Sequence, residues 1–173
     1  MSKVSTIFSL VFVLVMAAGV FAPAAMAAPK GDTIVDVALA ANAQSGEFSI
    51  LIAALLAADP AVIQTLSGNG QFTVFAPTDA AFVALLGELG MTAEELLSNQ
   101  ELVTTVLLYH VARGNRDSAD VLGSDRIRTL QRGFLFQDGG VLTDANGRTS
   151  NIIATDIPAA NGVIHVIDRV VLP

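Results

Sequence analysis

Helical and β-type patterns occupy separate halves of this chain, and that separation constrains the fold more than any other feature. Apolar residues recur at helical spacing from about residue 32 to residue 108. Beyond that point, short runs of β-forming residues are separated by Gly139-Gly140, Asn146-Gly147 and Asn161-Gly162, dipeptides that suit tight turns. This order predicts the α+β class, with helices packed on an antiparallel sheet or a small sandwich. No internal repeat or linker is evident, so we expect a single domain.

Capping residues mark three helix starts in the first half. They are Asp59 before Pro60, Thr78 before Asp79, and Thr92 with Glu95 in a capping box. Between the first two, residues 71–76 alternate in polarity and predict a strand that Pro77 ends. Helices are expected over residues 32–41, 48–59, 60–66, 79–86 and 99–108.

The first 27 residues are typical of a secretory signal peptide. Lys3 supplies the positive charge, residues 7–20 form an uncharged apolar run, and Ala25-Met26-Ala27 places small residues at a cleavage site. A membrane anchor is the alternative, but the apolar run is shorter than the roughly 20 residues that a spanning helix needs. We therefore expect cleavage after Ala27, export to the periplasm or the exterior, and one domain over residues 28–173.

The charge balance argues against nucleic-acid and membrane-surface roles. Without residues 1–27 the chain loses Lys3 alone among its charged residues, which leaves 8 basic and 16 acidic side chains and a formal net charge of −8. Such a surface repels phosphate backbones and anionic lipids. The chain has no cysteine, so disulfides, thiol catalysis and thiolate metal sites are excluded.

Three motifs resemble the fasciclin-like domain family. They are "FTVFAPTDAAF" at 72–82, "LLYHV" at 107–111 and "NGVIHVIDRVVLP" at 161–173, in the order and spacing of that family's first block, Tyr-His motif and second block. The resemblance implies a wedge of two small β-sheets flanked by α-helices, in an extracellular or periplasmic protein. Members of the family are typically adhesion or matrix modules, few have an assigned enzymatic activity, and some bacterial and algal members bind apolar pigments.

The resemblance also implies where a protein partner binds. In animal members, an Asp-Ile pair and the Tyr-His region are implicated in integrin contact, and the matching positions here are Asp156-Ile157 and Tyr109-His110. Pro158 follows the pair directly, which restricts Ile157 to an extended conformation. The flanks thus depart from the family pattern, and integrin binding is not carried over as the native activity.

The remaining motif residues are interpreted as structural. They are Phe75, Pro77, Thr78 and Asp79 in the first block and Asn161, Gly162 and His165 in the second. The apolar C-terminal run predicts a central strand covered on both faces, in which the ring of His165 is hydrogen-bonded and Ile164 and Val166 face away from it. Asp156 is expected on an exposed loop that leads into this strand.

Tyr109 and His110 allow two interpretations. They could hold a ligand or poise a proton, or they could pack in the core with their polar atoms tied to nearby backbone. The second interpretation is favoured, because a histidine without a nucleophile or acid beside it is an incomplete catalytic set. The two histidines have no companion cluster, so we expect no metal and no cofactor.

Two functions remain open on this evidence. The first is a secreted, non-catalytic module that contacts cell-surface or matrix proteins in adhesion or biofilm association. The second is a carrier of a small apolar ligand such as a carotenoid or lipid, suggested by the 53% hydrophobic composition and the Ala- and Leu-rich residues 48–58. Phosphate loops and the Gly-x-Ser-x-Gly and His-Glu-x-x-His motifs are missing, so an enzyme is not expected.

Overall fold

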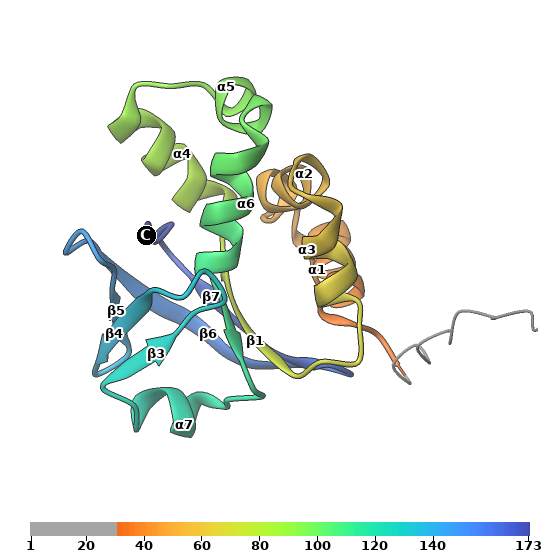
Figure 1. Ribbon diagram of the computed structural model, residues 1–173, viewed down its shortest axis with the longest axis vertical. Coiled ribbons are helices and arrows are strands. Elements are labelled where there is room, and N and C mark those ends of the chain that lie inside the picture. Colours follow the sequence, from red (N-terminus) through yellow and green to blue (C-terminus); the bar gives the residue numbers. More distant parts are fainter. Residues whose placement is uncertain (1–30) are drawn as a thin grey trace, which may run out of the picture.

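The computed structural model describes residues 31–173, and the expected signal peptide at 1–27 lies outside them. In Figure 1 the helices α1–α6 lie on one side of a curved sheet, and the short α7 lies at the opposite end. The α+β class expected from the sequence is confirmed. The helices are α1 (Ile34–Ser45), α2 (Ser49–Ala57), α3 (Pro60–Leu66), α4 (Asp79–Leu89), α5 (Ala93–Ser98), α6 (Gln100–Tyr109) and α7 (Ser118–Leu122).

Within residues 31–173, seven strands form one nearly closed sheet in the order β2-β1-β7-β6-β5-β4-β3. They are β1 (Phe72–Pro77), β2 (Val111–Arg113), β3 (Arg126–Arg128), β4 (Phe134–Asp138), β5 (Val141–Thr143), β6 (Thr149–Ala159) and β7 (Gly162–Ile167). The long β6 joins two halves, since one end pairs with β5 and the other with β7. A bridge between Ala112 and Thr129 brings β2 close to β3. The two small sheets of the expected wedge are therefore continuous through β6.

The pairing of β1 with β7 corrects the expectation of an antiparallel sheet. These two strands run parallel, with Phe72 opposite Gly162 and Pro77 opposite Ile167, whereas the other neighbouring strands are antiparallel. Four helices and five strands separate β1 from β7 along the chain. Only a long connection can return a chain to pair in parallel, and the local turn signals gave no sign of it.

Two apolar cores lie on opposite faces of the β1–β7 pair. Ile164 and Val166 of β7 belong to the core beneath α1–α6, whereas Ile167 belongs to a second core within the curved sheet. All six residues of β7 are buried, so the C-terminal run is the covered interior strand that the sequence predicted. The second core is built from Phe75, Tyr109, Ala112, Val121, Ile127, Leu135, Leu142, Ile167 and Val171.

The expected helix caps are present. The side chains of Asp59 and Thr78 accept hydrogen bonds at the starts of α3 and α4, and Thr92 and Glu95 form the capping box of α5. The expected end of α4 at residue 86 was too early, because the helix continues to Leu89 and ends at the left-handed Gly90. The short helix α7 was not expected from the sequence.

Asp79 and Asn161 bind segments far away in the chain. The Asp79 carboxylate accepts from the backbone N–H groups of Ser49 and Ile50 at 3.1 and 2.8 Å, and so caps α2 from outside. The fully buried Asn161 amide accepts from the N–H of Ile34 and donates to the carbonyls of Leu66 and Gly68. The Asn161 side chain thus ties the entry of α1 and the end of α3 to the start of β7.

Candidate functional site

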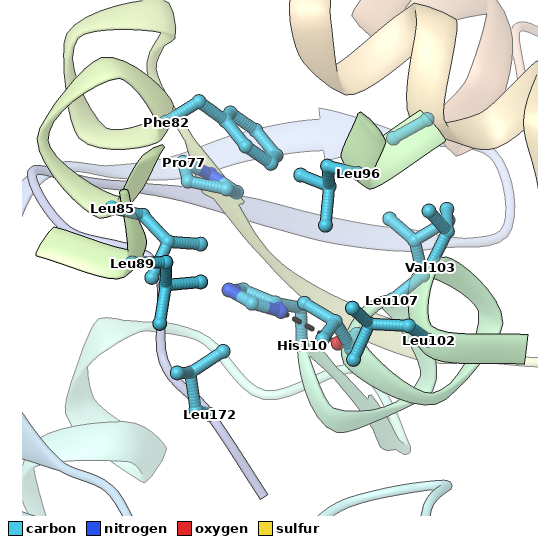
Figure 2. Close-up of a pocket in the computed structure, with 12 residues that line it drawn as sticks. Pro77, Phe82, Leu85, Leu89, Leu96, Leu102, Val103, Leu107, His110 and Leu172 are labelled. Carbon is cyan, nitrogen blue, oxygen red and sulfur yellow. Dashed lines mark hydrogen bonds between the residues drawn. The ribbon is translucent and has the colours of Figure 1, made fainter. Parts of the chain in front are cut away.

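An apolar pocket lies between α2, α4, α5, α6 and the C-terminal segment. It has a volume of about 260 Å³, larger than the ~150 Å³ apolar cavities that take up benzene in engineered proteins. Figure 2 shows Phe82, Leu85 and Leu89 on one side and the residues of α5 and α6 on the other. The lining consists of Ala54, Pro77, Phe82, Leu85, Leu89, Leu96, Leu102, Val103, Val106, Leu107, His110 and Leu172.

Helical periodicity explains why α4 and α6 line the pocket. In α4 the lining residues Phe82, Leu85 and Leu89 recur at intervals of three and four, so they share one face. The lining residues of α6 and its C-cap follow the same rule from Leu102 to His110. Leu89 is 48% exposed, so the pocket has a side that faces solvent.

His110 is the one polar residue in the lining, and both of its ring nitrogens are engaged. Nδ1 lies 2.7 Å from the carbonyl oxygen of Val106, the contact drawn as a dashed line in Figure 2. Nε2 accepts a hydrogen bond from the backbone N–H of Val171 at 3.2 Å. These contacts fit a neutral imidazole with its proton on Nδ1. The ring therefore offers no free hydrogen bond to a molecule in the pocket.

Burial keeps His110 neutral. The residue is 2% exposed, and burial lowers the pKa of its imidazole from 6.5 to about 4, although the hydrogen bond to Val106 and the charge of Asp144 oppose the shift. Protonation of Nε2 would also remove the acceptor that binds the N–H of Val171. The pocket wall is thus uncharged at neutral pH, and the chemistry of the lining suits an apolar guest.

Ion pairs hold α4 against the sheet next to the pocket. Glu88 of α4 contacts Arg148 at 2.6 Å and Arg169 at 3.5 Å. Arg148 precedes β6, and Arg169 follows β7, so the pairs join α4 to two parts of the second half of the chain. They fix the helix that supplies Phe82, Leu85 and Leu89 to the lining.

Tyr109 points away from the pocket, into the second core. Its hydroxyl donates to the carbonyl of Phe134 at 2.7 Å and accepts from the N–H of Ala145 at 3.1 Å. Burial raises the pKa of the hydroxyl, so it stays protonated and keeps the proton that it donates. Tyr109 and His110 are neighbours in sequence but serve different cores, and both tie down backbone as the favoured interpretation expected.

Asp156 lies within β6 rather than on the expected loop. The register of β6 against β7 shifts between Ala154 and Ile157, and Asp156 adopts a left-handed φ of 61° in that irregularity. Its carboxylate accepts from the N–H of Ser118 at 2.7 Å, and its side chain is exposed. Strand pairing on both sides of the bulge is the reason that this segment is not a loop.

His165 holds the bulge from inside. Its Nδ1 accepts from the N–H of Asp156 at 3.3 Å, and its Nε2 lies 2.9 Å from the carbonyl oxygen of Arg116. The ring is fully buried and stacks on Phe75 with centroids 5.8 Å apart. As predicted, the His165 ring is hydrogen-bonded within the sheet, and its proton belongs on Nε2, the opposite arrangement to His110.

The structure brings only part of the predicted contact set together. Asp156 and His165 meet at the bulge, and Ile157 beside it is half-buried in the pairing with Ile164. The Tyr109 and His110 side chains are buried in the two cores, so any part they take in partner binding is indirect. The sequence did not locate the pocket, because its lining comes from four helices, the end of β1 and the C-terminal segment. The only indication of a cleft was the small side chains of α2.

The arrangement over residues 31–173 defines a class of protein, a small module in which helices pack on a nearly closed sheet. The Fasciclin domain family matches residues 46–173, and the chain belongs to that family. The FAS1 domain pair of the insect cell adhesion molecule fasciclin I has a similar structure. It gives a TM-score of 0.59 at 18% identity, covering 74% of this chain and 46% of that one, which supports the shared fold.

Two bacterial proteins are similar in sequence. Protein sll1483 of Synechocystis is 40% identical over 145 residues, which cover 82% of this chain and 73% of that protein. Immunogenic protein MPB70 of Mycobacterium bovis is 34% identical over 154 residues, which cover 87% of this chain and 76% of that protein. The family resemblance that three short motifs indicated is thus confirmed over most of the chain.

The buried His110 predicts that acid destabilises the fold. Between pH 6.5 and pH 4 the unfolded chain binds a proton at residue 110 that the folded chain does not, so the free energy of unfolding falls as the pH falls. The loss amounts to about 3 kcal/mol over that interval. Urea unfolding at a series of pH values measures this loss. In His110→Gln, the free energy of unfolding that is lost between pH 6.5 and pH 4 should be smaller by the same amount.

A direct control is the ¹⁵N chemical shift of the His110 ring in the wild-type chain. A neutral ring protonated on Nδ1 down to about pH 4 is expected. Titration of the His110 ring near pH 6.5 would contradict a neutral, hydrogen-bonded imidazole. So would a pH dependence of the free energy of unfolding that is the same in His110→Gln as in the wild type.

Proposed function

We propose that the chain is a secreted, non-catalytic interaction module that contributes to cell-surface adhesion or to matrix and biofilm association through protein contacts. Membership of the Fasciclin domain family supports this role, and the structural relative is described as a cell adhesion molecule. The observation that carries the proposal is the exposed, fixed carboxylate of Asp156, at the position that the resemblance implicates in partner contact.

Asp156 is preorganised for contact. A left-handed aspartate in a strand is uncommon, and here Ser118 and His165 both hold the residue in that conformation. The hydrogen bonds from Ser118 lower the pKa of the carboxyl, so it is anionic at neutral pH. A fixed, charged and exposed group loses little conformational entropy when a partner binds it.

A non-catalytic role is consistent with how the histidines are used. Each ring has both nitrogens in hydrogen bonds to backbone groups, so neither ring is available as a general base without breaking a structural contact. Residues 1–27 as a signal peptide and residues 28–173 as the exported domain remain part of this proposal. Among residues 31–173, no single helix is long and apolar enough to cross a bilayer. The helices α2 and α3 meet these criteria only when taken together, and they are bent by 117° relative to each other.

The role of Asp156 is tested with Asp156→Asn. Asparagine tolerates the left-handed conformation and can still accept from Ser118, so the fold is retained while the charge is lost. Purified wild-type domain added to the producing cells should change their attachment to a surface. The variant should be about tenfold less potent, as expected for the loss of one charge-assisted contact.

The matched control is Asp138→Asn, which removes an equal charge from another exposed aspartate, at the end of β4. It should act like the wild type. Equal loss of potency in both variants would reject a specific role for Asp156. No effect of the wild-type domain or of gene deletion on attachment would remove support for the adhesion function itself.

The pocket favours a second candidate, a carrier of a small apolar ligand such as a carotenoid or lipid. The candidate rests on a cavity of about 260 Å³ whose only polar side chain is fully hydrogen-bonded. Ligand sites are concave and mostly apolar, and this pocket shares that character, although its volume of about 260 Å³ lies just below the usual range of about 300–1,000 Å³. A hydrocarbon segment would fill it without leaving a buried polar group unpaired.

The carrier role is tested with Leu89→Asp against Val83→Asp. Both residues lie in α4 and are exposed, at 48% and 62%, but only Leu89 lines the pocket. A carboxylate at position 89 should weaken binding of the apolar fluorophore Nile red at least about tenfold, because the charge would have to be desolvated in the pocket. Val83→Asp should leave binding unchanged.

The natively purified chain supplies the second measurement. Visible absorbance, or a lipid extractable for mass spectrometry, is expected of a carrier. Absence of both, together with equal Nile red binding by the two variants, would reject this candidate and leave the adhesion proposal unaffected.

A further inference from the structure

One exposed face of the sheet combines arginine and phenylalanine side chains. Arg126 and Arg128 of β3 stand opposite Phe136 and Phe134 of β4, and cross-strand partners project from the same side of a sheet. The other side of these strands carries the fully buried Ile127 and Leu135. We name the exposed set of four side chains the Arg-Phe face.

The aromatic part of this face is unusually open. Phe134 is 37% exposed and Phe136 is 50% exposed, although each ring could gain free energy by burial. The guanidinium of Arg126 lies 5.2 Å from the centre of the Phe134 ring, which orients the arginine over the aromatic surface. Arginine and aromatic residues together are the composition enriched at protein–protein contacts.

The backbone beneath the face is rigidly held. The Tyr109 hydroxyl donates to the carbonyl of Phe134, and β4 is paired on both sides, with β3 and with β5. A side chain at position 133 would collide with the Tyr109 ring, since a Cβ there would lie 2.7 Å from it. The buried tyrosine of the Tyr-His motif therefore supports an exposed surface.

The charge of the face is opposite to that of the chain. Arg126 and Arg128 form no ion pair within residues 31–173, where the ion pairs involve Arg148 and Arg169. Arg132 in the β3–β4 connection is exposed as well. The whole sequence has a net charge of −7, so most of its surface repels an acidic partner while this face attracts one.

We propose that the Arg-Phe face binds an extended acidic segment of a protein partner, with Asp or Glu at every second position. Arg126 and Arg128 are two residues apart on a strand, and so are Phe134 and Phe136. Alternate residues of an extended chain repeat every ~6.6 Å, so alternate carboxylates match the two guanidinium groups. Apolar parts of the segment cover the two rings.

This inference rests on the proposed interaction function but names a different surface from the Asp156 bulge. It is tested with a fluorescein-labelled peptide that has glutamate at every second position and threonine between. Fluorescence anisotropy with the full chain should show saturable binding that weakens as salt is added. Arg126→Gln and Arg128→Gln should each weaken binding about tenfold, and Phe136→Ser should also weaken it.

Arg169→Gln is the matched control, because it removes an equal charge beside Glu88 of α4. It should bind the peptide as the wild type does. A peptide of the same composition with its glutamates in one block should bind at least about tenfold more weakly. The double variant Arg126→Glu with Arg128→Glu should lose the acidic peptide and gain affinity for an alternating lysine peptide.

The proposal is overturned by equal binding of the alternating and block peptides, by equal weakening in Arg169→Gln, or by no binding at low salt. Preferential binding of alginate, a polyuronate, over the peptide would overturn it in favour of a carbohydrate partner. If the peptide experiments fail but the domain still changes cell attachment, only the proposed role of the Arg-Phe face is rejected. Loss of both would reject the interaction function as well.

Discussion

The parallel pairing of β1 with β7 determines how the other elements of the fold are arranged. It joins the first and second sequence blocks across most of the chain and separates the two cores. The backbones meet so closely at Gly162 that a Cβ there would collide with the carbonyl oxygen of Phe72. Asn161 then fixes α1 and α3 beside this junction, and His165 stacks on Phe75 across it.

The buried polar residues of the motifs stabilise the fold through hydrogen bonds to backbone groups, whereas the proposed contacts with partners lie on the exposed surface. His110 holds the C-terminal segment, His165 holds the Asp156 bulge, and Tyr109 holds the backbone of Phe134. Each buried polar group thereby fixes an exposed or semi-exposed feature that could meet a partner or ligand. This division explains why the polar atoms of the two histidines and of Tyr109 are used in backbone contacts within the fold.

The sequence predicted the features that depend on local chemistry. Thr78 and Thr92 cap helices because a hydroxyl at that position binds the N–H groups of the first turn, and the apolar tail is a covered strand because its residues have few polar atoms to solvate. The tying of Tyr109 and His110 to backbone followed from the rule that buried polar groups are paired.

Features that depend on distant contacts could not be predicted in this way. The Asp79 cap of α2, the hydrogen bonds of Asn161 and the parallel β1–β7 pair each join residues far apart in the chain. The bulge at Asp156 arises from the register of two strands, and no residue type in "ATDIPAANG" requires it. The pocket likewise exists only once several elements have packed together.

One pair of variants tests the close approach of β1 to β7 directly. In Gly162→Ala the new methyl group meets the backbone of Phe72, so the free energy of unfolding should fall by at least about 3 kcal/mol. Gly87→Ala makes the same change in α4, where the new methyl group would meet nothing within 4 Å apart from its chain neighbours and the backbone of its own helix, and it should be neutral or stabilising by up to about 1 kcal/mol. Chemical denaturation that finds Gly162→Ala as stable as Gly87→Ala would contradict the pairing.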